Sequence, residues 1–278
     1  MSAHPRKPRG RPRSAAPDRE GGSVQALERA MALLTALASS DKATLSDLAL
    51  RTGVPPSSAH RLLMTLQAGR FVEFDETTAE WAVGIEVFRV GSSFLRRTRV
   101  TEAAREQMRA LVAQTGETAN LGIADGGEVV FVGQMESAQP IRAFFAAGVR
   151  APMHSSGIGK ALMAAMPRDR VEALLQRTGL PGFTPRTLTA PADLFADLDR
   201  IRARGWALDD EERHEGMRCV ASAIFNPHGE VVAGISISGP AVRLGADRVG
   251  EIGPLMRRAA AAVTERIGGI VPTGWGKA

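Results

Sequence analysis

The sequence contains no tyrosine and one cysteine, Cys219, among its 278 residues. A single cysteine allows no internal disulfide and no multi-cysteine zinc site, which is typical of proteins that work in a reducing cytoplasm. The five histidines are scattered at positions 4, 60, 154, 214 and 228 and form no H-E-x-x-H motif or paired-ligand spacing. We therefore expect no bound metal and no cofactor.

Long apolar runs are missing as well. Neither a secretory signal core nor a membrane-spanning stretch follows the N-terminus. The composition, 44% hydrophobic and 23% charged, indicates a soluble globular chain with room for two domains. The sequence thus predicts a cytoplasmic protein with no membrane partner.

The usual catalytic motifs are also absent. The segment GIGK, which ends at Lys160, lacks a P-loop's first glycine, because His154 stands there, and Ala161 replaces the hydroxyl residue. Residues 154–157, HSSG, do not form a G-x-S-x-G elbow. Asp209, Glu212 and Cys219 could form a thiol-dependent site, but no neighbour in the sequence lowers the pKa of the thiol. We therefore expect that the protein is not an enzyme.

What the chain does have is a basic N-terminal arm. Six basic and two acidic residues give residues 1–22 a net charge of +4, and the whole chain carries only +5. This Pro/Gly-rich segment cannot bury apolar surface, so it is predicted to be disordered when free. Its centre, PRGRPR, resembles an AT-hook that inserts Arg9, Arg11 and Arg13 into a narrow minor groove. The alternative is a basic tail that only aids solubility.

Residues 44–83 carry the pattern of a winged helix-turn-helix. Leu45, Leu48 and Ala49 repeat at helical spacing and Gly53 ends the run, while Pro55 and Pro56 suit the start of a second helix. Ser57 or Ser58 could cap that helix. The alternating strings FVEF and EWAV, on either side of a polar turn, then predict a β-hairpin wing. An ordinary helical hairpin packed on a larger core is the alternative.

The second helix of this unit is the expected DNA-recognition helix. Ala59, Leu62, Leu63 and Leu66 form an apolar face. Arginine can bind guanine O6 and N7, and the smaller polar side chains reach phosphates or base edges. The residues predicted to contact DNA from its other face are Ser57, Ser58, His60, Arg61 and Thr65.

The folded DNA-binding unit is not basic. Residues 23–83 hold five basic and seven acidic residues, a net charge of −2. Because phosphate neutralisation supplies much of protein–DNA affinity, strong binding needs the arm, the recognition helix or a second copy of the unit. The sequence therefore predicts a dimer bound to double-stranded DNA.

The rest of the chain predicts a linker helix and an α+β domain. Residues 84–100 form the linker, in which Arg96, Arg97 and Arg99 either approach DNA or form a solvated face. Helices and β-hairpins then alternate, with turns at 125–127 and 227–229, and a last helix at about 246–267 is expected to pack across the sheet. We predict an arm over 1–22, a winged helix-turn-helix over 23–83, the linker over 84–100, the α+β domain over 101–270 and a tail over 271–278.

This order of elements, with the strings APMHSSGIGKAL and GWALDDEERHEGMRCVASAIFN, resembles the IclR family of bacterial transcriptional regulators. The resemblance covers about residues 22–269 and is most specific at Gly205, Asp209, Glu212 and Cys219, followed by ISISGP. It implies a GAF-like domain that binds a small effector, commonly a carboxylate or aromatic acid, and a homodimer that often pairs into a tetramer. By position, the resemblance implies an effector site of Gly157, Ile158, Asp209, Met217, Cys219, Ser236 and Ser238.

The chemistry of these residues agrees with an acid-binding pocket. Ser155, Ser156 and Gly157 open a helix whose free N–H groups favour an anion, and Ser236 and Ser238 point to one side of a strand. Each also has a purely structural interpretation. Ser156 could be a helix cap, the two strand serines could lie on a solvated face, Cys219 could be a core residue and Asp209 a turn residue.

Two hypotheses therefore remain from the sequence. In the preferred one, the protein is a transcription factor, cytoplasmic and nucleoid-associated when bound to its operator. A metabolite in the C-terminal domain changes its affinity for a pseudo-palindromic site. In the other, it is a small-molecule enzyme or sensor whose N-terminal hairpin mediates assembly. The AT-hook-like arm favours the first.

Overall fold

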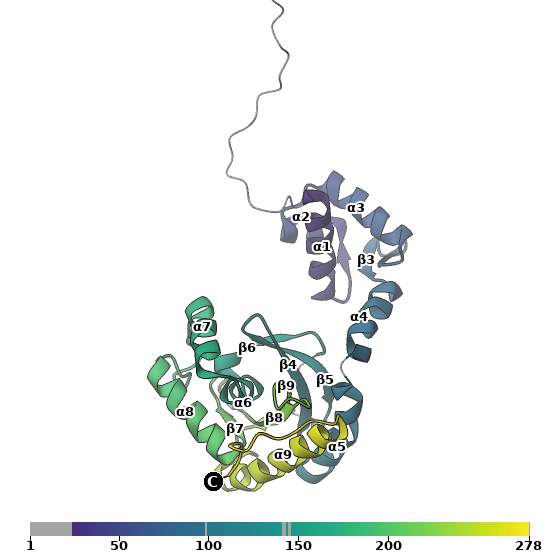
Figure 1. Cartoon of the computed structure of the whole chain (residues 1–278). Helices are drawn as coiled ribbons and strands as arrows, with labels where there is room; N and C mark the ends of the chain where they lie inside the picture. Colours follow the sequence, from purple (N-terminus) through teal and green to yellow (C-terminus); the bar gives the residue numbers. More distant parts are fainter. Residues whose placement is uncertain (1–23, 98, 141–142, 144–145, 278) are drawn as a thin grey trace, which may run out of the picture. The chain divides into compact units, whose positions relative to one another are not determined.

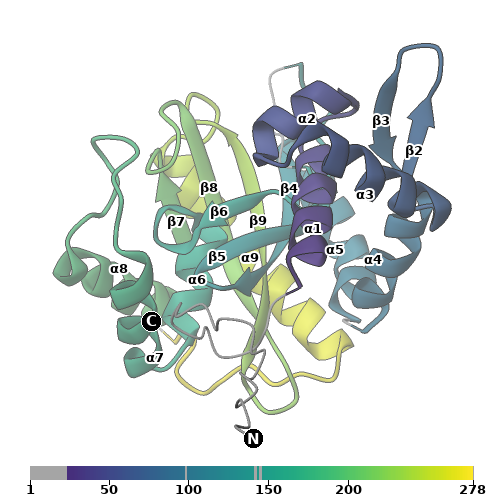
Figure 2. The ribbon, with the colours of Figure 1, turned by 90° about the horizontal axis from the view of Figure 1, so that it is seen from above.

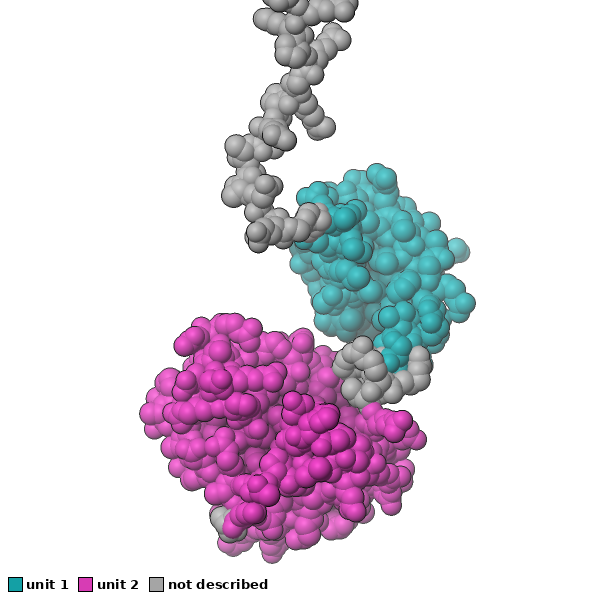
Figure 3. Space-filling view, viewed as in Figure 1, with its two compact units in different colours: residues 1–93 teal, residues 94–278 magenta. Residues whose placement is uncertain are grey.

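The computed structural model describes residues 24–97, 99–140, 143 and 146–277. The chain divides into two compact units, residues 1–93 and 94–278 (Figure 3). The predicted arm, with Arg9, Arg11 and Arg13, lies outside the described residues.

The first unit is the predicted winged helix-turn-helix. Its small sheet has the strand order β1-β3-β2, and β1 is a short strand that the sequence pattern did not predict. Its elements are α1 (Gln25–Ala38), β1 (Ala43–Thr44), α2 (Leu45–Thr52), α3 (Pro56–Ala68), β2 (Val72–Asp75) and β3 (Glu80–Val83).

Local sequence explains the boundaries of these helices. Thr44 and Asp47 form a capping box at the start of α2, and Gly53 ends it with a φ of 66°. Helix α3 begins at Pro56, as expected, but no side chain caps it. The prediction that Ser57 or Ser58 caps α3 is therefore wrong. Proline at the first position already removes one of the unpaired N–H groups that a cap would satisfy.

Two helices connect the wing to the second unit. Helix α4 (Ile85–Arg97) corresponds to the predicted linker, and α5 (Val100–Thr115) ends at Gly116, whose φ is 73°. The boundary between the two compact units falls inside α4.

The second unit is built on a six-stranded antiparallel sheet with the order β6-β5-β4-β9-β8-β7. The predicted hairpins and the final helix are confirmed, whereas β6, β7 and α7 were not predicted. Its remaining elements are β4 (Thr118–Asp125), β5 (Glu128–Met135), β6 (Arg150–Pro152), η1 (Met153–Ser155), α6 (Gly157–Ala165), α7 (Arg168–Thr178), α8 (Pro191–Arg204), β7 (Ala207–Asp210), β8 (Met217–Phe225), β9 (Val231–Pro240) and α9 (Ala246–Arg266).

Helices cover both faces of this sheet (Figures 1 and 2). Helices α5 and α9 pack on one face with Val220, Ile235 and Ile237, and α6, α7 and α8 pack on the other with Ala221 and Phe225. Because residues alternate between faces along a strand, Ser236 and Ser238 lie on the α6 face. Both are buried, so the alternative that they lie on a solvated face is wrong.

None of the helices in the described part of the chain is long and apolar enough to cross a membrane.

The segment predicted as a tail packs against the second unit. Trp275 is 7% exposed and meets the ring of Phe225 edge-on, with 5.5 Å between the ring centroids. The Gly276 N–H donates to the Arg202 carbonyl at 2.9 Å. The end of the chain thus contributes a buried aromatic residue to the core of this unit.

Replacing Trp275 with alanine should destabilise the second unit by about 3 kcal/mol or more, because a buried tryptophan is lost and a cavity remains. Trp275→Phe, which retains part of the ring contact, should cost less. Urea denaturation of the full chain measures both. Val242→Ala, at a valine that is 92% exposed, is the control. Equal stability of Trp275→Ala and the parent protein would show that the tail contributes nothing to the core.

Candidate functional site

Helix α3 presents a polar face away from the core of the first unit. Ala59 and Leu63 are fully buried, which fixes the orientation of the helix. Of the predicted DNA contacts, Ser57, His60, Arg61 and Thr65 are exposed and Ser58 is half-buried. The side chains needed for DNA recognition are thus accessible.

A groove between α1 and α3 adds a second arginine to this face. Its cavity of about 230 Å³ is lined by Ala26, Arg29, Ser58, Arg61, Leu62 and Thr65. Arg29 was not predicted, because helical periodicity places a residue on a face of its own helix and does not say which helix lies beside it. The groove therefore brings two cationic side chains to one surface.

The wing, in contrast, is acidic. Its acidic residues are Glu73, Asp75, Glu76 and Glu80. Lys42 reaches Asp75 at 2.6 Å and neutralises one of these charges. A surface of this sign repels phosphate, so DNA affinity has to come from elsewhere in the protein.

A small polar cavity opens on the α6 face of the large sheet. Its volume is about 30 Å³, room for the centre of little more than one water molecule. The residues lining it are Phe131, Ala151, Ser155, Ser156, Asp209, Arg213, His214, Met217, Arg218, Cys219 and Ser238. Four predicted effector residues, Asp209, Met217, Cys219 and Ser238, are among them. Asp209 lies in β7, not in a turn.

The other three predicted effector residues lie behind the cavity wall. A Cβ on Gly157 would come within 2.8 Å of Cys219 Sγ, so this glycine lets α6 approach β8 closely. The side chain of Ile158 is fully buried over Gly122 and Gly234. Ser236 is also fully buried. Gly157 and Ile158 thus position the helix over the sheet.

The sheet register aligns the polar side chains into rows. Asp209 pairs with Cys219, Cys219 with Ser238, and Ser238 with Thr118. In the next row, Ser236 pairs with Asn120 and Asn120 with Gln134.

Hydrogen bonds link these rows. Asn120 Nδ2 donates to Ser238 Oγ at 3.3 Å, and Gln134 Nε2 donates to Asn120 Oδ1 at 3.2 Å. The sequence analysis missed Asn120 and Gln134. The alternation of polar and apolar residues along residues 118–122 was the available signal.

Three buried hydroxyls have no hydrogen-bond partner among the described residues, those of Thr101, Ser155 and Ser236. A buried polar group without a partner is rare in a folded protein and suggests that a ligand or water satisfies it. Ser155 lines the cavity just before the N-terminus of α6, where Ser156 Oγ accepts from the Gly159 N–H at 3.4 Å. Unpaired hydroxyls beside the positive end of a helix suit an anion.

Burial alters the acid–base behaviour of the cavity. It raises the pKa of Asp209 to about 7, and the charge of Glu212 adds to this effect. It also raises the pKa of the Cys219 thiol to about 11, aided by the charge of Asp209, although the residue itself is only half-buried. At neutral pH the thiol therefore stays protonated, which argues against a nucleophilic role.

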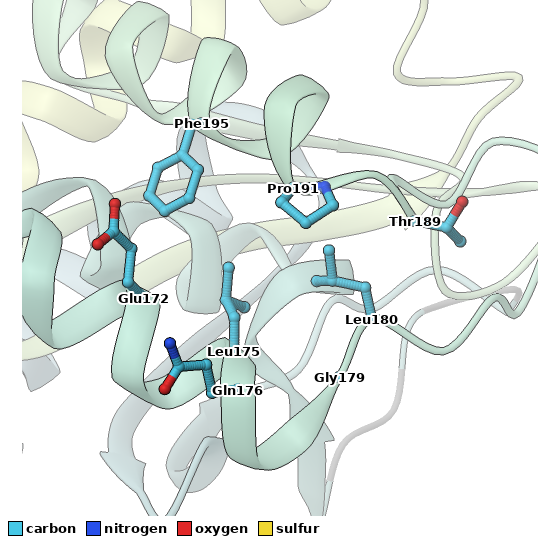
Figure 4. A pocket seen from close by; sticks show the side chains of 8 residues that line it. All are labelled: Glu172, Leu175, Gln176, Gly179, Leu180, Thr189, Pro191 and Phe195. Atoms are coloured by element: carbon cyan, nitrogen blue, oxygen red, sulfur yellow. The ribbon is translucent and has the colours of Figure 1, made fainter.

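A larger cavity of about 420 Å³ lies between α7 and α8 (Figure 4). Apolar side chains, among them Leu175, Leu180 and Phe195, face it. The one carboxylate on its wall, Glu172, is paired with Arg168 at 3.0 Å. None of the predicted effector residues lines this cavity.

A winged helix joined to an α+β unit with a cavity is the arrangement of ligand-responsive DNA-binding regulators. Comparison with known families agrees. The IclR helix-turn-helix domain model matches residues 26–76, and the model described as bacterial transcriptional regulator IclR C-terminal matches residues 92–265. The chain belongs to the IclR family, whose members are transcriptional regulators with an effector-binding C-terminal domain.

Individual family members are similar in sequence to this chain along almost its whole length. HTH-type transcriptional regulator BhcR of Paracoccus denitrificans is 49% identical over 248 residues, which cover 88% of each protein. HTH-type transcriptional repressor AllR of Escherichia coli is 40% identical over 261 residues, 94% of this chain and 96% of AllR. The crystal structure of Thermotoga maritima IclR superposes with a TM-score of 0.74 at 28% sequence identity. The superposed region covers 87% of this chain and 98% of the Thermotoga chain.

The raised pKa of Asp209 predicts a specific pH dependence of stability. The unfolded carboxyl titrates near 3.8 and the folded one near about 7, so the folded state loses stability as pH rises between these values. Asp209→Asn keeps an acceptor for the Glu212 N–H and removes the titration. The unfolding free energy of the variant minus that of the parent protein should therefore increase by on the order of 2 kcal/mol when the pH is raised from 5 to 8.5.

Urea denaturation at the two pH values measures this change. Asp199→Asn, at an exposed carboxylate on α8, is the charge-matched control. An Asp209→Asn difference that stays constant with pH would show that Asp209 ionises as an ordinary carboxyl.

Proposed function

We propose that this regulator binds a pseudo-palindromic operator through α3 and that a small carboxylic acid in the α6-face cavity changes its affinity for that site. The observation that carries the DNA part is the exposed polar face of α3, with Arg61 accessible and Ala59 and Leu63 holding the opposite face in the core. Residues on such a face can reach base edges in the major groove. Arg29, beside Arg61 in the α1–α3 groove, adds a phosphate contact.

A second copy of the chain completes the DNA-binding surface. Val24, which immediately precedes α1, and Leu27 and Met31 of α1 are spaced as one helix face, and each is more than half exposed. On α4, Phe88 is 71% exposed. Contiguous exposed apolar residues of this kind mark association surfaces. A homodimer that covers them, and beyond it a dimer of dimers, would present two recognition helices to the two halves of a palindrome.

The arm and the second copy together offset the unfavourable charge of the first unit. Because the folded unit has a net charge of −2 and an acidic wing, phosphate neutralisation has to come largely from other segments. Arg9, Arg11 and Arg13 in the minor groove would supply it. The protein would act in the cytoplasm, on the nucleoid when bound to its operator.

The chemistry of the effector cavity supports a carboxylic acid. The unpaired hydroxyl of Ser155, the hydroxyl of Ser238 and the start of α6 provide hydrogen-bond donors for a carboxylate. Binding would shift the dimer between arrangements that differ in the spacing of their recognition helices, and a coupling of about 1–3 kcal/mol is enough for a useful switch.

Arg61→Ala should weaken operator binding by about 1–3 kcal/mol and relax sequence choice, because a side chain that contacts bases is lost. Effector binding should be unchanged. Fluorescence anisotropy with DNA flanking the protein's own gene measures operator affinity, and a parallel titration with a scrambled duplex measures sequence preference. Arg177→Ala removes the same charge from the exposed side of α7 and is the matched control. Normal operator binding by Arg61→Ala would mean that α3 does not read the DNA.

Short carboxylic acids should raise the melting temperature of the protein, because a ligand that binds only the folded form stabilises it. Pyruvate, succinate and benzoate represent keto acids, dicarboxylates and aromatic acids, and the acid with the largest shift identifies the class that the cavity binds. Ser238→Ala should abolish the shift. Thr189→Ala removes a hydroxyl from the wall of the α7–α8 cavity instead and should leave the shift intact. If none of the three acids shifts the melting temperature, the effector assignment fails.

A further inference from the structure

A fully buried lysine lies beneath the effector cavity. Lys160, on α6, is 1% exposed. Its Nζ donates to Asp197 Oδ2 of α8 at 2.8 Å and to Glu212 Oε1 of the β7–β8 loop at 2.5 Å. The other oxygen of Asp197 accepts from Arg200 at 3.2 Å. A buried charge is expensive unless it is paired, so this arrangement holds Asp197 and Glu212 close to the lysine.

Glu212 connects this cluster to the cavity. Its backbone N–H donates to Asp209 Oδ1 at 2.8 Å, and Asp209 lines the cavity. The backbone carbonyl of Glu212 accepts from the Thr187 hydroxyl at 2.6 Å, which fixes the loop. The Glu212 carboxylate therefore stands between the lysine and Asp209, and its Oε2 is buried without a hydrogen-bond partner among the described residues.

Three carboxyl groups, Asp197, Glu212 and Asp209, lie around one buried ammonium, and the exposed Arg200 pairs with Asp197 as well. Lys160 bonds directly to the first two, whereas no cation lies within ion-pairing distance of Asp209 in the described part of the chain. Buried carboxyl groups close to one another cannot all ionise, and the one without a cation retains its proton. The pKa of Asp209, raised to about 7, agrees with this assignment.

Other titratable and charged groups face Asp209 from the elements around it. They are Lys160 of α6, Glu212, Arg213 and His214 of the β7–β8 loop, and Arg218 and Cys219 of β8. The two arginines are engaged elsewhere. Arg218 Nε lies 2.5 Å from Asp210 Oδ1, and the Arg213 guanidinium lies 3.8 Å from the centre of the Phe183 ring. His214 is exposed.

We propose that burial and the charge of Glu212, which Lys160 holds in place beside Asp209, keep a proton on Asp209. The cavity then receives an anionic acid with a neutral hydrogen-bond donor, and above neutral pH binding is coupled to uptake of one proton from water. An ionised Asp209 would repel the acid. A protonated Asp209 donates to it, and the bound negative charge in turn strengthens the hold of Asp209 on its proton. Lys160 and Glu212 are thus positioning residues that act through Asp209. This inference rests on the proposed effector function.

The coupling predicts how affinity changes with pH. Each of pyruvate, succinate and benzoate that shifts the melting temperature is titrated calorimetrically into the full-length protein between pH 5.5 and pH 8.5, in two buffers of different ionisation enthalpy. The affinity of the parent protein should be nearly constant at the acid end and fall by up to about tenfold per pH unit at the alkaline end. Proton uptake should approach about one per site at pH 8.

Variants separate this coupling from a structural effect. Glu212→Gln keeps an acceptor for Lys160 and removes the charge next to Asp209, so the pH at which affinity declines should move to lower values. Asp209→Asn should abolish both the decline and the proton uptake. Glu215→Gln, at an exposed position of the same loop, makes the same charge change away from the cluster and should behave like the parent protein.

The outcomes distinguish the two proposals. An acid that binds with the same affinity at every pH and without proton uptake would overturn the coupling and leave the effector site in place. A Glu212→Gln profile identical to that of the parent protein would remove the cluster from the argument. If no acid of the panel binds at all, the effector function fails, and the coupling fails with it.

Discussion

The alternation of side chains along β9 is the constraint on which the second unit depends. Helices cover both faces of the sheet, so neither face can present polar residues to bulk water. Ile235 and Ile237 fill the face under α5 and α9, and Ser236 and Ser238 are consequently buried on the other. Buried hydroxyls require partners. Asn120 satisfies Ser238, whereas Ser155 and Ser236 remain without a partner, and of these two Ser155 lines the cavity.

A buried lysine beside this region connects three elements of the second unit. Lys160 connects α6, α8 and the β7–β8 loop through Asp197 and Glu212. Buried ion pairs contribute little net stability, because desolvation offsets the attraction between the charges. Their value here is placement, since the cluster holds Glu212 beside Asp209. Under the proposed coupling, the charge state of the cavity depends in part on residues that do not line it.

The DNA-binding unit has little positive charge of its own with which to bind phosphate. Its recognition helix is polar but carries few charges, and its wing is acidic. A single copy of the unit would bind DNA weakly, because phosphate neutralisation supplies much of the affinity. Two features could raise the affinity. The exposed apolar residues of α1 and α4 could pair two copies of the unit, and the basic arm could neutralise phosphates. In the proposed mechanism, DNA affinity therefore depends on assembly, and assembly is the property that the effector changes.

The sequence by itself determined most of the helices, though not α7, together with the hairpins, the winged helix-turn-helix and the family, because periodicity, capping residues and glycine or proline breakers act over a few neighbouring positions. It also indicated Asp209, Cys219 and Ser238. Only the tertiary structure decided that Arg29 lies beside Arg61, that Gly157 and Ile158 lie behind the cavity wall and that Lys160 joins two carboxylates distant in sequence. It likewise added β6, β7 and the packed tail. Such placements depend on which elements become neighbours, and that is set by burial across the whole sheet, a property that no local pattern contains.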